Sequence, residues 1–215
     1  MQNLKNIHDF YQSSGLYDRV ILKNNTLTPN KTIEDLKLEI LKFSNFYNKS
    51  NDELVFSDGN IKSKIMIIGE APGVTDEIEG KPFCGETGEL LDKMLNAIGL
   101  NRDKTYITNV INFRLADNKK PSLEDINRFK PFLVEHIKIV NPEYILILGS
   151  IALQSLFNNA LPISKERGNW KELKVNNKHI LCMPSFHPAF LLRQSQQKKL
   201  SWEDLKKFRD KINFN

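Results

Sequence analysis

Three polar segments of this chain directly follow apolar stretches of strand length. They are Gly69-Glu70, Thr108-Asn109 and Ser185-Phe186-His187-Pro188. Their side chains include a carboxylate, an amide and an imidazole, which proteins use for acid–base chemistry and for hydrogen bonding to polar ligands. Because the carboxyl ends of parallel strands lie at one edge of a sheet, these residues can converge although they are distant in sequence.

The segment from residue 65 to residue 85 is the most informative stretch of the chain. It begins with the apolar run IMII, which is typical of a strand buried on both faces. The turn that follows contains Glu70 and Gly73, and a glycine lets the backbone approach a ligand closely. Three more carboxylates come next: Asp76, Glu77 and Glu79. Taken alone, this segment fits an ordinary acidic surface loop as well as an active site.

The rest of the chain alternates between strand and helix patterns. We expect strands at residues 65–68, 105–111, 144–148 and 178–183, with helices at 86–98 and 122–142, after 149 and near the C-terminus. This alternation predicts an α/β protein, a three-layer α/β/α sandwich around a central, mainly parallel four-stranded sheet. We expect residues 1–54 to form a helical region packed on the core, and residues 55–215 to form one globular domain.

Composition restricts the class of protein only loosely. The chain has 215 residues, a net charge of +5 and two cysteines, Cys84 and Cys182, without metal-site spacing. The positive charge is weak support for an anionic partner such as nucleic acid. No apolar run approaches the length of about 20 residues that a membrane span needs, and the N-terminus lacks the apolar core of a signal peptide. We therefore expect a soluble, cytoplasmic monomer.

Five sequence motifs, in this order, resemble those of the uracil-DNA glycosylase superfamily, most closely its family 4. They are GEAPG at 69–73, KPFCGETGELLDKML at 81–95, YITNV at 106–110, ISKERGNW at 163–170 and SFHPAFLLR at 185–193. GEAPG alone would be weak, but the ordered combination is specific. The resemblance extends from about Val55 to Arg209 and implies an enzyme that removes uracil from uracil-containing DNA by cleaving the N-glycosidic bond.

The resemblance also implies roles for particular residues. Phe83 would stack on a uracil that has been flipped out of the DNA, beside a backbone wall at Gly69 and Ala71. Asn109 would pair its amide with the O4 and N3–H edge of uracil, which cytosine cannot match. His187 would donate a hydrogen bond to uracil O2 as negative charge develops on the departing base.

The role of the carboxylates is less settled by the resemblance. Glu70 would position or activate water and stabilise positive charge on the sugar. Asp76 is the competing candidate for this catalytic role. Glu77 and Glu79 are expected to be solvated loop charges.

DNA binding is expected from the loop after His187 and from nearby basic residues. Leu191 or Leu192 would insert into the vacated base stack, while Arg193 would support the DNA backbone or the opposite strand. Phosphate contacts are expected from a set of basic side chains: Lys165, Arg167, Lys198 and Lys199. Each of these lysines could equally be an ordinary solvated surface charge.

The sequence departs from the family pattern at the metal site. Family 4 enzymes typically bind a four-iron four-sulfur cluster through four cysteines. Here the corresponding positions hold Lys42, Asn45, Phe113 and Arg128, so we expect no metal and no cofactor, with apolar packing or polar contacts in place of the cluster. A second class of relatives traps DNA through a histidine in the stretch that here reads NFRLADNKKPS, which has none.

We therefore expect a monofunctional uracil-DNA glycosylase of base-excision repair. One alternative is a catalytically weak DNA-binding or damage-sensing relative. Another is a nucleotide hydrolase, which would need a set of metal-binding carboxylates that the sequence does not offer convincingly.

Overall fold

The protein is built around a six-stranded sheet with the strand order β1-β3-β2-β4-β6-β5. The structure, a computed structural model, describes residues 31–157 and 162–213. The strands are β1 (Ser57–Gly59), β2 (Ile65–Gly69), β3 (Tyr106–Asn109), β4 (Tyr144–Leu148), β5 (Lys171–Val175) and β6 (Lys178–Ser185). The four inner strands are parallel, and β1 and β5 pair antiparallel at the two edges.

The predicted α/β/α sandwich with a mainly parallel sheet is confirmed, but the predicted number of four strands is too low. The two additional strands are the edge strands. β1 has the sequence SDG and no apolar residue, and β5 is only buried at its last residue, Val175. Edge strands face water, so they lack the continuous apolar run that identifies the inner strands.

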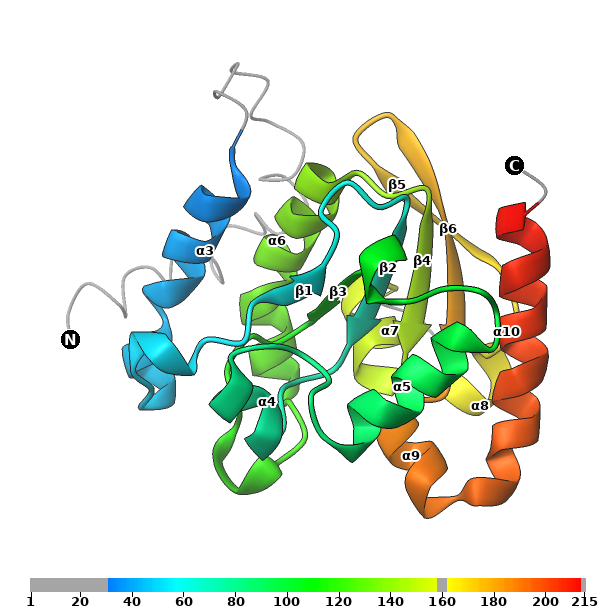
Figure 1. Ribbon diagram of the computed structural model, residues 1–215. Coiled ribbons are helices and arrows are strands. Elements are labelled where there is room, and N and C mark those ends of the chain that lie inside the picture. The colour runs from blue at the N-terminus through cyan, green and yellow to red at the C-terminus, as the bar shows by residue number, and fades with distance from the viewer. Residues whose placement is uncertain (1–30, 158–161, 214–215) are drawn as a thin grey trace. The chain divides into compact units, whose positions relative to one another are not determined.

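Helices cover both faces of the sheet, as Figure 1 shows for α3 and α6 on one face and for α5 and α10 on the other. The helices are α3 (Ile33–Leu41), α4 (Val74–Glu79), α5 (Glu86–Asn96), α6 (Leu123–Val140), α7 (Ser150–Leu156), α8 (Ile163–Glu166), α9 (Pro188–Arg193) and α10 (Lys198–Asn213). Short 3₁₀ turns lie at Ser44–Tyr47, Asn51–Glu53, Arg102–Lys104, Ala116–Asn118 and Ser195–Gln197.

The alternation of side chains along each strand builds two separate cores. In β2, Met66 and Ile68 pack into the core beneath α3, α6 and α7, while Ile65 and Ile67 pack into the core beneath α5, α9 and α10. All five residues of β2 are buried. This two-sided burial confirms the interpretation of the IMII run as an inner strand.

The N-terminal part of the chain is described only from residue 31. α3 begins with a capping box formed by Thr32 and Asp35 and buries Leu36 and Ile40 in the core. The expected helical structure before residue 31 lies outside the described residues, and the boundary expected between residues 54 and 55 stays a prediction. Among the helices that the structure describes, none is long and apolar enough to cross a membrane.

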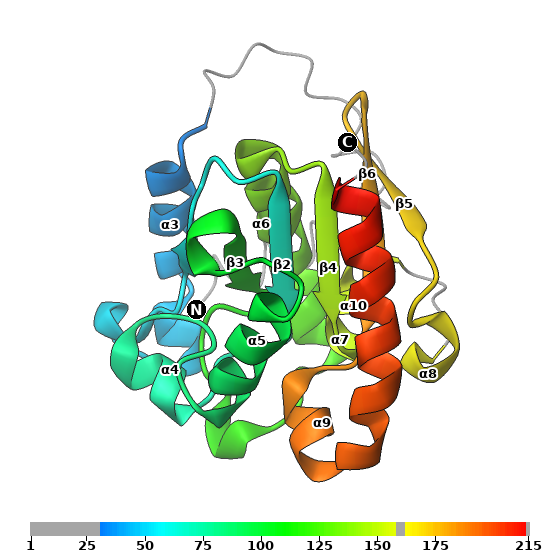
Figure 2. The same ribbon diagram turned by 45° about the vertical axis from the view of Figure 1, so that its right-hand side comes forward.

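The parallel inner strands all run in one direction and end at the same edge of the sheet. Figure 2 shows the arrows of β2 and β4 ending at the edge where α9 begins. Gly69 at the end of β2 pairs in register with Asn109 at the end of β3, and Leu148 of β4 pairs with Ser185 of β6. The three polar segments of the sequence are therefore brought to one edge.

Candidate active site

Gly69 lies at the centre of a small group of polar and aromatic side chains at this edge. A Cβ atom on Gly69 would collide with Asn109 Oδ1 and would lie 2.5 Å from Cζ of Phe83. The amide of Asn109 and the ring of Phe83 therefore both press against the backbone of Gly69. Only glycine allows this approach. The turn sequence predicted a close backbone approach at Gly73 instead, but the φ of Gly73 is −90°, which any residue can adopt. Ala71, two residues on, is half-buried and packs against the core under α6.

Phe83 presents its ring to the site from a left-handed turn. Its φ is +58°, a conformation that costs a non-glycine residue of the order of 1–3 kcal/mol. Its side chain is 3% exposed, and the ring stacks on the imidazole of His187 with centroids 5.5 Å apart and an interplanar angle of 28°. Phe83 and His187 thus form adjoining walls, although about a hundred residues separate them in the sequence.

Asn109 carries a buried acceptor that the protein leaves unused. The residue is 3% exposed, and its Oδ1 atom has no hydrogen-bond partner among the described residues. Buried polar atoms are nearly always hydrogen-bonded, so an unpaired one at a strand end points to a ligand that supplies the partner. A ligand N–H beside the ring of Phe83 would satisfy it.

Glu70 follows Gly69 and extends toward β4. One carboxylate oxygen, Oε1, accepts a hydrogen bond from the backbone N–H of Ile151 at 3.0 Å. Burial raises the pKa of Glu70, and the backbone N–H groups at the start of α7, with the charges of Lys120 and Arg193, only partly oppose this. The carboxyl group is thus held in a partly desolvated place at the edge of the sheet.

His187 and Glu70 border the same glycine, Gly149. A Cβ atom on Gly149 would collide with the carboxylate of Glu70 and would lie 3.1 Å from Cβ of His187. The φ of Gly149 is +97°, so a side chain there would also be strained. Sequence reasoning placed Gly149 only at a helix start. Its position at the end of the third apolar strand was the signal that could have assigned it to the site.

The protonation of His187 is fixed by its surroundings. Its Nδ1 atom accepts a hydrogen bond from the backbone N–H of Ala189 at 3.1 Å. The ring must therefore carry its proton on Nε2 when it is neutral. Burial, aided by the charge of Arg193, lowers the pKa of His187 to about 4. At neutral pH the ring is an uncharged hydrogen-bond donor through Nε2.

Asp76 binds backbone N–H groups with both of its carboxylate oxygens. Its two oxygens accept hydrogen bonds from the N–H of Gly73 at 2.9 Å and from the N–H of Cys84 at 2.7 Å. The residue is 7% exposed. Asp76 therefore ties the turn after Glu70 to the turn that carries Phe83.

Glu77 differs from the expectation of a solvated loop charge. Its carboxylate pairs with Lys49 and with Arg114, at 2.7 Å for Arg114 Nε, and its side chain is only 11% exposed. No local pattern predicts these pairings, because Lys49 and Arg114 are both distant from Glu77 in the sequence. The pairings join α4 to the segments before β1 and after β3.

The residues expected to contact DNA differ in their availability. Leu192 is 40% exposed, whereas Leu191 is buried in the core, so only Leu192 is free to insert into a base stack. Arg193 is exposed. The lysines at 165, 198 and 199 are also exposed.

Arg167 is engaged inside the protein. Its guanidinium pairs with the carboxylate of Asp204, which is fully buried and also accepts a hydrogen bond from Ser185 Oγ at 2.7 Å. This use differs from the phosphate contact expected from the sequence. Because Ser185 lies two residues before His187, the ion pair supports the strand end that carries the histidine.

Lys120 is a residue that sequence reasoning did not single out. Its side chain is exposed, and its charge acts on the carboxylate of Glu70. It belongs to the basic stretch NFRLADNKKPS, whose position after the second strand of the site was the available signal. Lys120 and Arg193 together place positive charge near Glu70 from two different segments.

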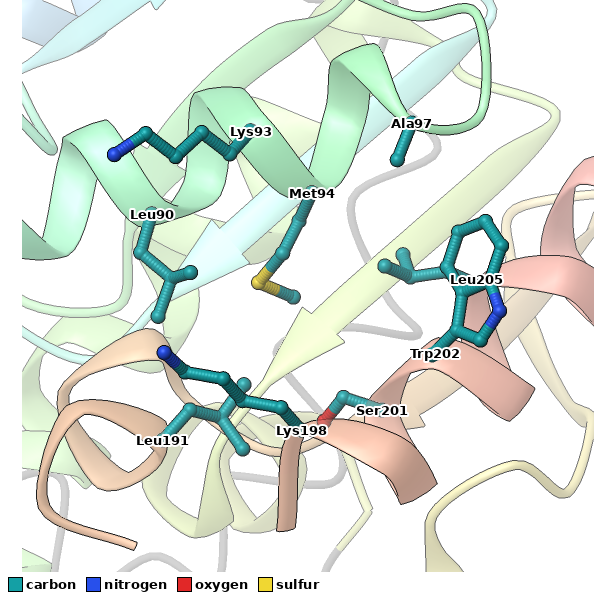
Figure 3. Close-up of a pocket in the computed structure, with 9 residues that line it drawn as sticks. All are labelled: Leu90, Lys93, Met94, Ala97, Leu191, Lys198, Ser201, Trp202 and Leu205. Atoms are coloured by element: carbon teal, nitrogen blue, oxygen red, sulfur yellow. The ribbon is translucent and has the colours of Figure 1, made fainter. Parts of the chain in front are cut away.

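A separate apolar hollow of about 230 Å³ lies between α5, α9 and α10. Figure 3 shows Met94 and Leu191 pointing into it, with Trp202 on its α10 side. It is lined mainly by apolar side chains and includes none of Glu70, Asn109 and His187. The hollow is therefore distinct from the group at the strand ends.

The positions expected to carry cluster cysteines do not fit an iron–sulfur cluster. Lys42 and Asn45 are exposed, and neither Phe113 nor Arg128 can supply a thiolate. Among the described residues, no three His, Cys, Asp or Glu side chains come together as a metal site.

An aromatic–arginine cluster occupies this region instead. Phe113 is fully buried and stacks on Tyr47 with centroids 5.8 Å apart. The guanidinium of Arg128 lies 3.8 Å from the ring centroid of Phe46, and it donates a hydrogen bond to Tyr47 Oη at 3.1 Å. We call Phe43, Phe46, Tyr47, Phe113, Arg128 and Phe129 the aromatic–arginine cluster.

The fold and the strand-end group together define an α/β protein with a small, partly desolvated site that offers a stacking ring, an unpaired amide and a neutral imidazole. Residues 56–206 match the uracil DNA glycosylase superfamily. The chain belongs to this superfamily.

Three relatives illustrate the similarity, and each is a Type-4 uracil-DNA glycosylase. That of Sulfurisphaera tokodaii is 37% identical over 158 residues, which cover 71% of this chain and 72% of the relative. That of Archaeoglobus fulgidus is 32% identical over 182 residues, covering 82% and 92%. That of Thermotoga maritima is 34% identical over 163 residues, covering 74% and 82%.

Proposed function

We propose that this protein is a monofunctional uracil-DNA glycosylase that removes uracil from DNA and leaves an abasic site for base-excision repair. The observation that carries the proposal is the convergence of the Phe83 ring and the unpaired Asn109 Oδ1 on Gly69. A flat ring beside a buried amide acceptor fits a pyrimidine that has an N–H on its pairing edge. The similarity to Type-4 uracil-DNA glycosylases supports the same function.

Recognition begins with removal of the base from the helix. Unstacking and unpairing a nucleotide costs a few kcal/mol, and least when the base is mispaired or unpaired. Stacking on Phe83 offsets part of this cost, since base–aromatic contacts contribute roughly 1–3 kcal/mol. The exposed Leu192 fills the vacated position in the stack, with Arg193 and the exposed lysines on the phosphates.

Asn109 selects uracil against cytosine. Its Oδ1 atom accepts from uracil N3–H, and its amide N–H₂ donates to O4. Cytosine has an acceptor at N3 and a donor at C4, so both pairs would be mismatched in a buried site. Unpaired buried polar groups cost about 1–3 kcal/mol each, which makes the discrimination steep.

Bond cleavage is assisted by His187 and Glu70. The electrons of the bond between uracil N1 and sugar C1′ pass to the base, so negative charge gathers at O2 and positive charge on the sugar. His187 Nε2–H donates to O2, and the carboxylate of Glu70 stabilises the sugar cation. Glu70 then takes a proton from a water molecule while the oxygen of that water bonds to C1′. The released uracil anion takes a proton from solvent.

Glu70 is the catalytic carboxylate in this proposal, and Asp76 positions the turns beside it. Both oxygens of Asp76 already bind backbone N–H groups, whereas Glu70 lies next to His187 at Gly149. The enzyme is proposed to act as a cytoplasmic monomer on single- or double-stranded DNA. Its glycosylase unit is proposed to span residues 55–215.

A gel assay for abasic sites tests the proposal. Oligonucleotides with one uracil, single-stranded or paired with guanine, are incubated with the protein in EDTA and then cleaved with alkali. We expect cleavage at the uracil only. An intact strand after prolonged incubation with wild-type protein would exclude the glycosylase and favour a DNA-binding or damage-sensing relative.

Two variants assign the roles, each with a matched control. Removing a preorganised donor raises a barrier by about 2.7–4 kcal/mol, so His187→Ala should lose about 10²–10³-fold in rate. The exposed His179 provides the control variant His179→Ala. Asn109→Ala should lose activity while still binding duplex DNA, with Asn169→Ala as its control. Wild-type rates in either site variant would refute the assigned role.

A further inference from the structure

The left-handed turn that carries Phe83 is held by a charged side chain from a distant segment. Arg102 Nη1 donates to the carbonyl of Pro82 at 3.2 Å, and Nη2 donates to the carbonyl of Phe83. Arg102 belongs to the 3₁₀ turn before β3. One guanidinium group therefore holds the two carbonyl groups that precede and follow the Cα atom of Phe83.

The guanidinium is itself oriented by two carboxylates. Arg102 Nη1 pairs with Asp58 at 2.7 Å, and Nε pairs with Asp92 at 2.9 Å. Only 25% of the Arg102 side chain is exposed. Because the planar guanidinium group is already held by two carboxylates, it loses little further freedom when it binds a carbonyl. It is therefore a rigid support.

Two further contacts fix the same turn. The N–H of Cys84 donates to Asp76, as described above, and α5 packs so closely that a Cβ on Gly88 would overlap the carbonyl of Phe83. A strained φ persists only where its surroundings determine it, and such strain is typical of functional sites. Around Phe83, the determinants are Arg102, Asp76 and Gly88.

We propose that Arg102 is a positioning residue for Phe83, setting the plane on which the flipped base stacks. By holding the Phe83 carbonyl beside α5, Arg102 keeps the ring against Gly69 and His187. Arg102 contacts neither Asn109 nor Glu70 among its hydrogen-bond partners. The inference rests on the proposed function, because it assigns a second residue to the same base-binding site.

A double-mutant cycle tests whether Arg102 acts through Phe83. Single-turnover excision rates are measured for wild type, Arg102→Gln, Phe83→Ala and the double variant. A misplacement of about 1 Å can cost 10²-fold in rate, so we expect Arg102→Gln to lose roughly 10–100-fold. In the Phe83→Ala background, Arg102→Gln should change the rate by less than about threefold, because the ring that it positions is absent.

Ligand binding separates positioning from general damage. Inhibition by free uracil should weaken by about the same factor as the rate in Arg102→Gln, while affinity for DNA with a stable abasic-site analogue stays within about twofold of wild type. Arg209→Gln, on an arginine paired only with its neighbour Asp210 among described contacts, is the matched control. Arg102→Lys keeps a cation that reaches one carbonyl, so it should recover part of the lost excision rate. If Arg102→Gln does not fold, Arg102→Lys takes its place in the double-mutant cycle.

The outcomes distinguish the inference from the function. A wild-type protein without excision activity would overturn the proposed glycosylase. An active wild type in which the Arg102 and Phe83 effects multiply independently would overturn the positioning role, as would an Arg102 variant with the wild-type rate and wild-type inhibition by uracil.

Discussion

The carboxylate of Glu70 accepts a hydrogen bond from the backbone N–H of Ile151, 3.0 Å away, across the ends of two neighbouring parallel strands. This bond and the backbone N–H of Ser150 are not enough to replace the water that the carboxylate gives up, because burial still raises the pKa of Glu70. Glu70 is thus a charge kept at a cost in stability. Such a cost is expected at a catalytic position rather than at a structural one.

The first prediction follows from that cost. A carboxyl group whose pKa is raised in the folded state binds its proton more tightly when folded, so its contribution to stability falls as pH rises from the ordinary value of 4.5 through the raised pKa. Glu70→Gln should therefore raise the melting temperature of the protein at neutral pH while abolishing excision. Calorimetry at pH 8 measures this, with the exposed Glu89→Gln as the control. A lower melting temperature for Glu70→Gln would contradict it.

The second prediction concerns pH and His187. Its pKa of about 4 in the folded protein lies below the ordinary 6.5, so the unfolded chain binds the extra proton first. Stability should fall as pH drops from 6.5 to 4, by about 1–3 kcal/mol from this residue. Stability measured at both pH values should depend less on pH in His187→Ala than in wild type. Equal pH dependence in the two proteins would disprove the uncharged state of the His187 ring at neutral pH.

The third prediction concerns the exposed leucine of α9. Leu192 is 40% exposed and directly precedes Arg193. Since a wedge acts by replacing the flipped base in a stacked duplex, Leu192→Ala should slow excision from duplex DNA by roughly tenfold and from single strands much less. The ratio of the two rates is the measurement. Leu38→Ala, on an exposed leucine of α3, should leave the ratio unchanged. An equal loss of excision rate on duplex and single-stranded DNA would argue against insertion of Leu192 into the base stack.

The fourth prediction separates two basic residues of one motif. Arg167 pairs with the buried Asp204, while Lys165 is exposed. Removing one partner of a buried pair costs about 3–5 kcal/mol, so Arg167→Gln should lower stability. Lys165→Gln should instead leave stability unchanged and reduce the salt dependence of DNA binding by about one unit of slope. Titrations of DNA binding at several salt concentrations, with thermal melts, distinguish the two. If Arg167→Gln instead reduced the salt dependence of DNA binding and left stability unchanged, Arg167 would be a DNA contact.

Arg167 also illustrates what the sequence could and could not predict. The inner strands and the site residues Glu70, Asn109 and His187 follow from apolar runs that end in polar residues, since a parallel sheet aligns its strand ends. Internal pairing is different, because whether an arginine faces solvent or a buried carboxylate depends on a partner elsewhere in the chain. The partners of Arg167 and Arg102 come from segments 37 and 44 residues away. Nothing in the local pattern near either arginine indicates them.

The same limit applies to the region where family 4 relatives are expected to bind a cluster. Substituted cysteines predicted the loss of the thiolate ligands, but the sequence did not show what packs there. In the structure, Arg128 joins the segment around Phe46 and Tyr47 to α6, and Phe113 stacks beneath Tyr47. Cation–π contacts contribute about 0.5–2 kcal/mol, more when they are desolvated. The aromatic–arginine cluster therefore links α6 to the segment around Phe46 and Tyr47.

The fifth prediction tests this substitution. Arg128→Ala should lower the free energy of unfolding by about 1–3 kcal/mol, because it removes both the contact with Phe46 and the hydrogen bond to Tyr47. Phe113→Cys, which restores one thiol, should be destabilised by about 3 kcal/mol through the cavity it leaves, without gaining iron. Denaturant unfolding and iron analysis measure these effects, with Arg209→Ala as the control. Stoichiometric iron in the wild-type protein, or an Arg128→Ala variant as stable as wild type, would contradict the stabilising role of the aromatic–arginine cluster.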